Sequence, residues 1–154
     1  MDQRLDYRKA APHGVAAFGT LQGYVDRCGL EHSLLELVKT RASQINGCGF
    51  CLDMHTKDAR GAGESEQRLH VLSAWREAPF YSERERAALA WTEAITRISD
   101  AAIGDTLYEE VRRHFDEKEL VDLTPAVIAI NGWNRLAIPF RTPVGSYQPR
   151  APRS

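Results

Sequence analysis

The apolar residues of this chain recur at intervals of three and four, and this spacing restricts the fold more than any other feature. The clearest stretch lies between residues 82 and 98, where one helical face would carry Ala87, Ala88, Trp91, Ala94, Ile95 and Ile98. A helix has about 3.6 residues per turn, so such spacing gathers apolar side chains on one face. No stretch alternates apolar and polar residues as a half-buried strand would. The pattern predicts an all-α protein of about six to seven helices.

The length of 154 residues predicts one domain that is large enough to have its own core. We expect a loose N-terminal arm over residues 1–12, a helical domain over residues 13–140, and an extended tail over residues 141–154. The tail holds three of the seven prolines, which disfavour regular structure there. Within the domain, Thr124-Pro125 predicts a kink or a break, because a proline inside a helix cannot donate the usual hydrogen bond.

Charge and composition exclude several classes of function. The net charge is −1 and charges of both signs are interspersed, which argues against nucleic-acid binding. No apolar run approaches the ~20 residues that cross a bilayer, and the N-terminus lacks the apolar core of a secretory signal. We therefore expect a cytoplasmic protein without a membrane partner. In that compartment three cysteines indicate thiol chemistry or metal binding rather than structural disulfides.

Four residues form the most informative motif: Glu36, Cys48, Cys51 and His55, spaced E-x₁₁-C-x₂-C-x₃-H. If a helix begins near residue 48, both thiols and the imidazole share one of its faces. Glu36 would lie roughly 18 Å away if one helix continued through the whole motif. Asn46-Gly47 removes this difficulty, because a left-handed glycine there would end one helix and reverse the chain.

These residues suit thiol chemistry. A thiol with a pKa of about 8.5 is mostly protonated at pH 7, whereas the thiolate is the nucleophile. Cys48 would lie at a helix N-terminus, which stabilises an anion. His55 is four residues after Cys51 and can take its proton, and Glu36 can orient His55 or hold that proton. Ser33-x-x-Glu36 is also a capping-box pattern, so Glu36 has an alternative role as a helix cap.

The motif and its flanks, residues 37–59 (LVKTRASQINGCGFCLDMHTKDA), resemble the alkylhydroperoxidase AhpD-like / carboxymuconolactone decarboxylase family. Residues 130–136 (INGWNRL) resemble the last helix of that family, and the match covers most of residues 20–140. The resemblance implies an AhpD-like helical fold, a cofactor-free site, and assembly as a homo-oligomer, commonly a trimer or hexamer. It further implies a thiol-dependent peroxidase, with Cys51 as the attacking thiol and Cys48 as proton donor and resolving thiol.

The implied cycle needs a small hydroperoxide as substrate and an external dithiol or redox protein as electron donor. One departure weakens it: some members carry an additional histidine between the cysteines, where this chain has Gly49-Phe50. A thiol–disulfide oxidoreductase without strong peroxidase activity is therefore an alternative. Carboxymuconolactone decarboxylases lack the cysteine pair, so decarboxylation is not expected.

Two further alternatives involve no catalysis. The two cysteines, His55 and Glu36 could supply four zinc ligands, although a second ligand pair like that of a zinc finger is absent. Alternatively, the cysteines are small buried residues of a binding module. We expect Cys28 to lie in the core. Asn134 and Arg135 interrupt an apolar helix, and we expect them near the active site or a subunit contact.

Overall fold

The structure is a computed structural model that describes residues 2–149. Every regular element in these residues is helical, with eight α-helices and one short 3₁₀ turn, which confirms the all-α prediction. The count exceeds the expected six to seven because a short helix, α1 (Tyr7–Ala10), lies in the N-terminal arm. Within the described residues, no helix combines the length and the apolar character that crossing a membrane requires.

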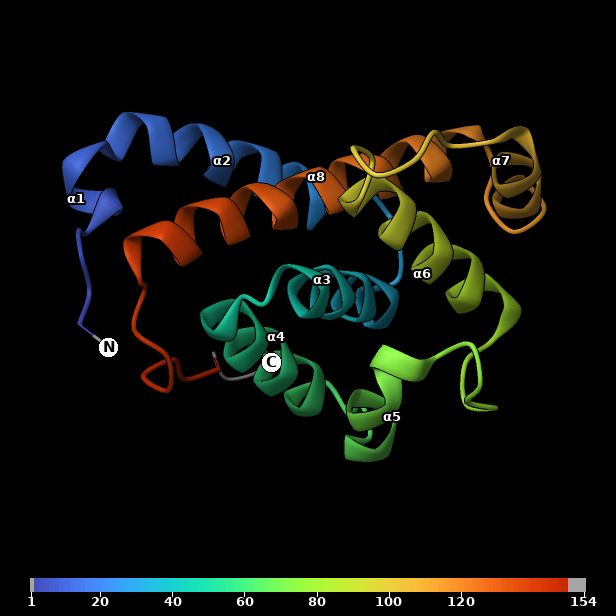
Figure 1. The fold of residues 1–154 in the computed structure, drawn as a ribbon, viewed down its shortest axis with the longest axis horizontal. Helices are drawn as coiled ribbons and strands as arrows, with labels where there is room; N and C mark the ends of the chain where they lie inside the picture. The colour runs from blue at the N-terminus through green and yellow to red at the C-terminus, as the bar shows by residue number, and fades with distance from the viewer. Residues whose placement is uncertain (1, 150–154) are drawn as a thin grey trace.

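The helices are arranged around α3 (His32–Asn46), which packs against three other helices (Figure 1). These are α4 (Gly49–Gly61), α6 (Glu83–Thr96) and α8 (Glu117–Phe140). The long α8 also lies alongside α2 (Pro12–Val25), and α7 (Asp105–Arg112) packs at one end. Between α4 and α6 the chain forms α5 (Glu66–Val71) and the 3₁₀ turn Leu72–Ala74.

The polar side of α3 is buried within the single chain. Leu37 and Val38 are fully buried, and so are Thr40 and Ser43, which lie on one polar side of this helix. Glu36 lies on that side too and is only 3% exposed. A carboxylate removed from water needs charged or hydrogen-bonding partners. The fold therefore requires partners for Glu36, and they come from α4 and from α3 itself.

The pattern Ser/Asp-x-x-Glu, which predicts a helix start, occurs at Ser33, Ser82 and Asp116, and two of these three predictions are correct. Ser82 and Asp116 accept hydrogen bonds from the Glu85 and Glu119 amides, and both glutamates bond back, so each helix begins with a complete capping box. The Ser33 pattern is misleading, because the N-cap of α3 is Glu31, two residues earlier, and Glu31 makes no side-chain capping bond. The cap role for Glu36 is therefore wrong.

The expected interruption at Pro125 does not end the helix, since α8 continues through it to Phe140. The missing amide leaves the Val121 carbonyl without its helical donor. Val121 is 65% exposed, so water can reach this carbonyl. The Thr124 hydroxyl donates to the Leu120 carbonyl at 3.0 Å and accepts from the Trp91 indole at 3.0 Å, so Thr124 is not a cap. Packing on both sides holds the helix together at this point.

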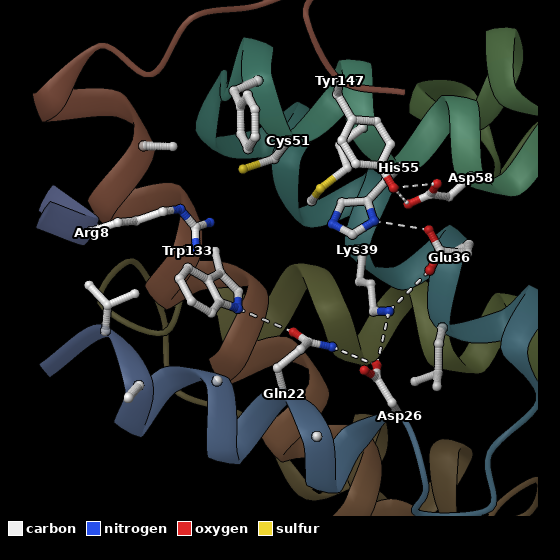
Figure 2. Close-up of a pocket in the computed structure, with 18 of the residues that line it drawn as sticks. Arg8, Gln22, Asp26, Glu36, Lys39, Cys51, His55, Asp58, Trp133 and Tyr147 are labelled. Carbon is white, nitrogen blue, oxygen red and sulfur yellow. Dashed lines mark hydrogen bonds and ion pairs between the residues drawn. The ribbon is translucent and has the colours of Figure 1, made fainter. Parts of the chain in front are cut away.

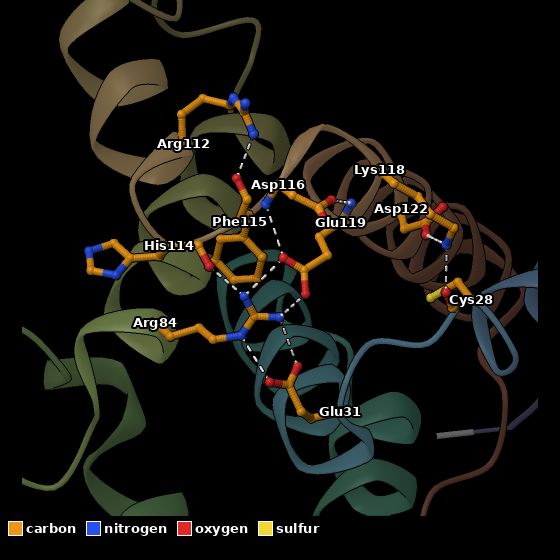
Figure 3. Close-up of polar contacts among 10 residues, drawn as sticks. All are labelled: Cys28, Glu31, Arg84, Arg112, His114, Phe115, Asp116, Lys118, Glu119 and Asp122. Atoms are coloured by element: carbon orange, nitrogen blue, oxygen red, sulfur yellow. Dashed lines mark hydrogen bonds and ion pairs between the residues drawn. The ribbon is translucent and has the colours of Figure 1, made fainter.

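Arg84 of α6 joins the starts of α3 and α8 (Figure 3). Its guanidinium donates to Glu31 at 2.9 and 3.1 Å and to Glu119 at 2.7 and 3.2 Å. It also donates to the His114 carbonyl and lies 4.1 Å from the centre of the Phe115 ring. This cluster fixes the start of α3 against α6 and α8.

Candidate active site

The turn between α3 and α4 positions the cysteines. Gly47 has φ 68°, the left-handed conformation that the sequence predicts, and it ends α3. The Cys48 amide donates to the Ser43 carbonyl at 3.0 Å, and Cys48 is the N-cap residue of α4. The chain reverses here, so α4 packs against α3 and brings its residues back toward Glu36.

The two sulfur atoms lie 2.7 Å apart, and each cysteine is 1% exposed. They pack against Ala42 of α3 and against Ile130 and Ala137 of α8. A disulfide bond is about 2.05 Å long, so the thiols reach bonding distance by a shift of less than ~1 Å. Such a pair can be oxidised and reduced with little movement of the backbone.

The two thiols differ in pKa. The hydrogen bond with Cys51 lowers the pKa of Cys48 to about 7, against the opposing effect of burial, and the backbone amides of Cys51 and Phe50 assist. The hydrogen bond with Cys48 and burial together raise the pKa of Cys51. Once the pair has lost one proton, the negative charge is therefore held on the sulfur of Cys48, the N-cap residue of α4. Moving the remaining proton between the sulfurs transfers that charge to Cys51.

His55 and Glu36 meet across α4 and α3, as their spacing with a Gly47 turn predicts. His55 Nδ1 lies 2.9 Å from Glu36 Oε2, and Lys39 Nζ lies 3.0 Å from Glu36 Oε1. Burial raises the pKa of Glu36, but the hydrogen bond and charge of His55, with those of Lys39, outweigh it and lower the pKa to about 2. Glu36 is therefore a permanent carboxylate at neutral pH. It can orient His55, and it is too weak a base to hold a proton.

A cavity of about 1120 Å³ opens beside these residues (Figure 2). Cys51, His55 and Glu36 all line it, whereas Cys48 is not among the lining residues that the structure describes. With a proton on Nδ1 donated to Glu36, His55 keeps Nε2 as its acceptor. Cys51 is therefore the thiol that a molecule in the cavity meets.

Three residues that the motif leaves out also shape the site. Lys39 is 6% exposed and lies between Glu36 and Asp26, 3.8 Å from the latter. Asn134 of α8 is fully buried and donates to Ser43 at 3.1 Å; its hydrogen bonding helps to lower the pKa of Cys48 and opposes the rise in the pKa of Cys51. The polar character of Asn134 in an apolar helix is the signal in the sequence, and its place beside the thiols agrees with the expectation.

Tyr147 lies in the segment after α8, and nothing in the sequence around it indicates a place in the site. Its hydroxyl donates to Asp58 at 2.8 and 3.0 Å, its carbonyl accepts from Lys57 at 3.0 Å, and its ring lines the cavity beside His55 (Figure 2). The Gly145 amide also donates to Asp53 at 3.2 Å. Residues 145–147 therefore lie along α4, and Tyr147 completes one wall of the cavity.

One group of potential metal ligands occurs in the described part of the chain: Glu36, His55 and Asp58, whose donor atoms all lie within 4.8 Å of one another. Neither cysteine belongs to it, so the zinc set of two thiols, His55 and Glu36 is not gathered around one point. Lys39 and Tyr147 already bond the two carboxylates of the group. The donor set is thus occupied by the protein's own hydrogen bonds.

Comparison with known proteins identifies the family and the fold. The carboxymuconolactone decarboxylase family model matches residues 10–94. The uncharacterised protein YdfG of Bacillus subtilis (strain 168) is 46% identical over 138 residues, which cover 90% of this chain and 94% of YdfG. A crystal structure from Agrobacterium tumefaciens, ATU0492, a protein of unknown function described as a candidate antioxidant defence protein AhpD, superposes with a TM-score of 0.91. It is 45% identical, and the match covers 95% of this chain and 100% of that one.

The fold also occurs in a protein with a different chemistry. The debrominase Bmp8 superposes with a TM-score of 0.79 at 21% identity, and the match covers 90% of this chain and 74% of Bmp8. At that identity the likeness extends to the fold alone. The chemistry of the present site has to be argued from its own residues.

Proposed function

The chain belongs to the carboxymuconolactone decarboxylase family, in its AhpD-like branch, and on that premise we propose that it is a thiol-dependent peroxidase. The observation that carries the proposal is the 2.7 Å separation of the Cys48 and Cys51 sulfurs, with Cys51 lining the same cavity as His55. In the proposed reaction a hydroperoxide is reduced to an alcohol and water while the two thiols become a disulfide.

In the first step Cys51 attacks the terminal peroxide oxygen as a thiolate. Its proton passes to Cys48 or to Nε2 of His55, and Glu36 stabilises the imidazolium that forms. The O–O bond breaks, one oxygen stays on Cys51 as a sulfenic acid, and the other leaves as an alkoxide that takes up the proton. Because Glu36 has a pKa of about 2, it acts by charge and orientation and not as a proton carrier.

In the second step the Cys48 thiolate attacks the Cys51 sulfur. The S–S bond forms as hydroxide leaves, and protonation of this hydroxide gives water. The lowered pKa of Cys48, about 7, suits this resolving role at neutral pH. An external dithiol or a redox protein then exchanges with the disulfide and returns both cysteines to the thiol state.

We further propose that the protein works as a homo-oligomer. Val121 and Ile128 lie seven residues apart on one face of α8 and are 65% and 51% exposed. Apolar side chains on a shared helix face favour contact with another copy. Light scattering or sedimentation should find a trimer or hexamer, and Val121→Glu with Ile128→Glu should yield the monomer. A wild-type monomer at micromolar concentration would contradict this assembly.

The catalytic proposal is tested by mixing the protein with an organic hydroperoxide and a dithiol and following peroxide consumption. Cys51→Ser should abolish turnover. Cys48→Ser should leave a single oxidation of Cys51 without turnover, seen as one added oxygen in the mass of the peptide that contains residue 51. Cys28→Ser is the matched control, because Cys28 lies in a separate core cluster and should leave the rate unchanged.

Full peroxide turnover by Cys51→Ser would refute the role of the pair. Dithiol oxidation by an added disulfide, without peroxide consumption, would favour the thiol–disulfide oxidoreductase. Elemental analysis of the purified protein tests the binding-module alternative, because stoichiometric zinc together with thiols that peroxide leaves unchanged would favour a structural site.

A further inference from the structure

Arg8 faces the same cavity as Cys51, from the side opposite Glu36 and Asp58 (Figure 2). The Arg8 guanidinium carbon lies 5.5 Å from the centre of the Tyr7 ring and 5.4 Å from that of Trp133. Contact with aromatic rings stabilises the cation without using its N–H donors. The side chain is thus held in place while the hydrogen-bonding edge of its guanidinium is still available to a ligand.

The carboxylates of the cavity are already matched. Glu36 bonds His55 and Lys39, and Asp26 lies 3.8 Å from Lys39 and accepts from Gln22 at 2.8 Å. At the other edge, the Tyr147 hydroxyl donates its hydrogen to the Asp58 carboxylate, whose two oxygens lie 2.8 and 3.0 Å away.

Arg8 differs from these groups. Among residues 2–149, no carboxylate lies within ion-pair distance of Arg8. A ligand with a negative charge could therefore pair with Arg8 without displacing an ion pair of the protein.

The wall between Arg8 and the reactive residues is apolar. It includes Val15, Phe50, Met54, Trp133 and Ala137. The volume of about 1120 Å³ slightly exceeds the range of roughly 300–1,000 Å³ typical of pockets that hold drug-sized ligands, so it far exceeds what hydrogen peroxide needs. A ligand that fits this arrangement has an apolar body and an anionic end group. A guanidinium binds a carboxylate through two parallel hydrogen bonds.

We propose that Arg8 binds the carboxylate of an amphipathic organic acid whose apolar body lies along this wall and whose reactive group reaches Cys51. The proposal rests on the peroxidase function for the identity of that reactive group, which is the hydroperoxide of a fatty-acid-like substrate or the thiol of a carboxylated dithiol reductant. The carboxylate is common to both sources. Recognition by Arg8 itself does not depend on the redox chemistry.

Binding is measured first, without turnover. Calorimetry with Cys51→Ser protein compares decanoate with its neutral analogue decanamide. Decanoate should bind about tenfold more tightly, as expected for a charge-assisted hydrogen bond at a partly exposed site. Adding Arg8→Gln should remove this preference, whereas Lys9→Gln, which removes an exposed charge from the same helix, should retain it. Circular dichroism melting checks that each variant is folded.

Equal affinity for decanoate and decanamide would overturn the proposal, as would equal weakening by Arg8→Gln and Lys9→Gln. If the preference is found but no peroxide is consumed, the subsite stands and the peroxidase function fails. Kinetics then identify the source of the carboxylate. A fatty-acid hydroperoxide is compared with its methyl ester, and dihydrolipoate with dihydrolipoamide. For one of these two pairs, kcat/KM should be higher for the acid than for its neutral analogue, and Arg8→Gln should remove this difference. If neither pair shows the difference, the link between Arg8 and catalysis is overturned.

Discussion

Replacing Glu36 by glutamine tests whether this buried carboxylate is held ionised by His55 and Lys39. Glutamine has nearly the same shape but no charge and no titration. The structure lowers the pKa of Glu36 from 4.5 to about 2. A carboxylate with a lowered pKa in the folded state stabilises the fold above its unfolded pKa, and this stabilisation is lost as the pH falls toward the folded pKa.

The size of the effect follows from the shift. A difference of 4.5 − 2, or 2.5 pKa units, corresponds to about 3 kcal/mol at neutral pH. Roughly 2 kcal/mol of this should be lost between about pH 5 and pH 3, since Glu36 protonates in the unfolded chain near pH 4.5 and stays ionised in the folded one. The glutamine variant lacks this contribution at every pH.

Urea unfolding of both proteins at several pH values between about 5 and 3 measures the effect. The free energy of unfolding of the wild type, minus that of Glu36→Gln, should fall by about 2 kcal/mol across this range. Glu66→Gln is the control, because Glu66 pairs with Arg60 at 3.2 Å but is 62% exposed, and its profile should run parallel to the wild type. A constant difference between the wild type and Glu36→Gln would refute the assigned ionisation.

Three other predictions follow from the same geometry. The ultraviolet absorbance of the Cys48 thiolate should appear with a midpoint near pH 7, and Cys51→Ala should raise that midpoint because it removes the main cause of the lowered pKa. Tyr147→Phe should reduce kcat/KM for peroxide up to about tenfold in steady-state assays, since loss of its charge-assisted hydrogen bonds loosens the cavity wall, while an unchanged value would show that this wall is not needed. Gly132→Ala should lower the free energy of unfolding by about 1–3 kcal/mol in urea, because the new methyl group would lie 2.3 Å from Phe18; a stabilised variant would contradict this packing.

The sequence predicts the local structure of this protein better than its long-range contacts. Gly47 and the Ser82 cap act within a few residues, and both are as predicted. Ser33 has the same local pattern as Ser82, yet burial of Glu36 against α4 outweighs it. At Pro125, exposure of the Val121 carbonyl region and packing on α6 outweigh the cost of the missing amide.

The site shows the same division. The spacing from Glu36 to His55 predicts which of these residues meet, because one turn determines their approach. Lys39 looks like one more surface cation in the sequence, and only the tertiary fold, which brings the residue after α2 close to α3, buries it beside Asp26. Tyr147 lies 89 residues from Asp58, a separation at which no periodic pattern carries information. Residues brought in by tertiary contacts are therefore the ones that sequence reasoning misses.

The cover that α8 places over the cysteines has a consequence for the protein's biosynthesis. Ile130, Asn134 and Ala137 are made some eighty residues after Cys48 and Cys51, so both sulfurs leave the ribosome before the helix that shields them exists. Nascent chains fold as each segment becomes available, and one of the three helices that pack against α3 is missing until α8 docks. Newly made chains therefore pass through an interval in which both sulfurs are open to solvent, and their burial is complete only when translation has gone past residue 137.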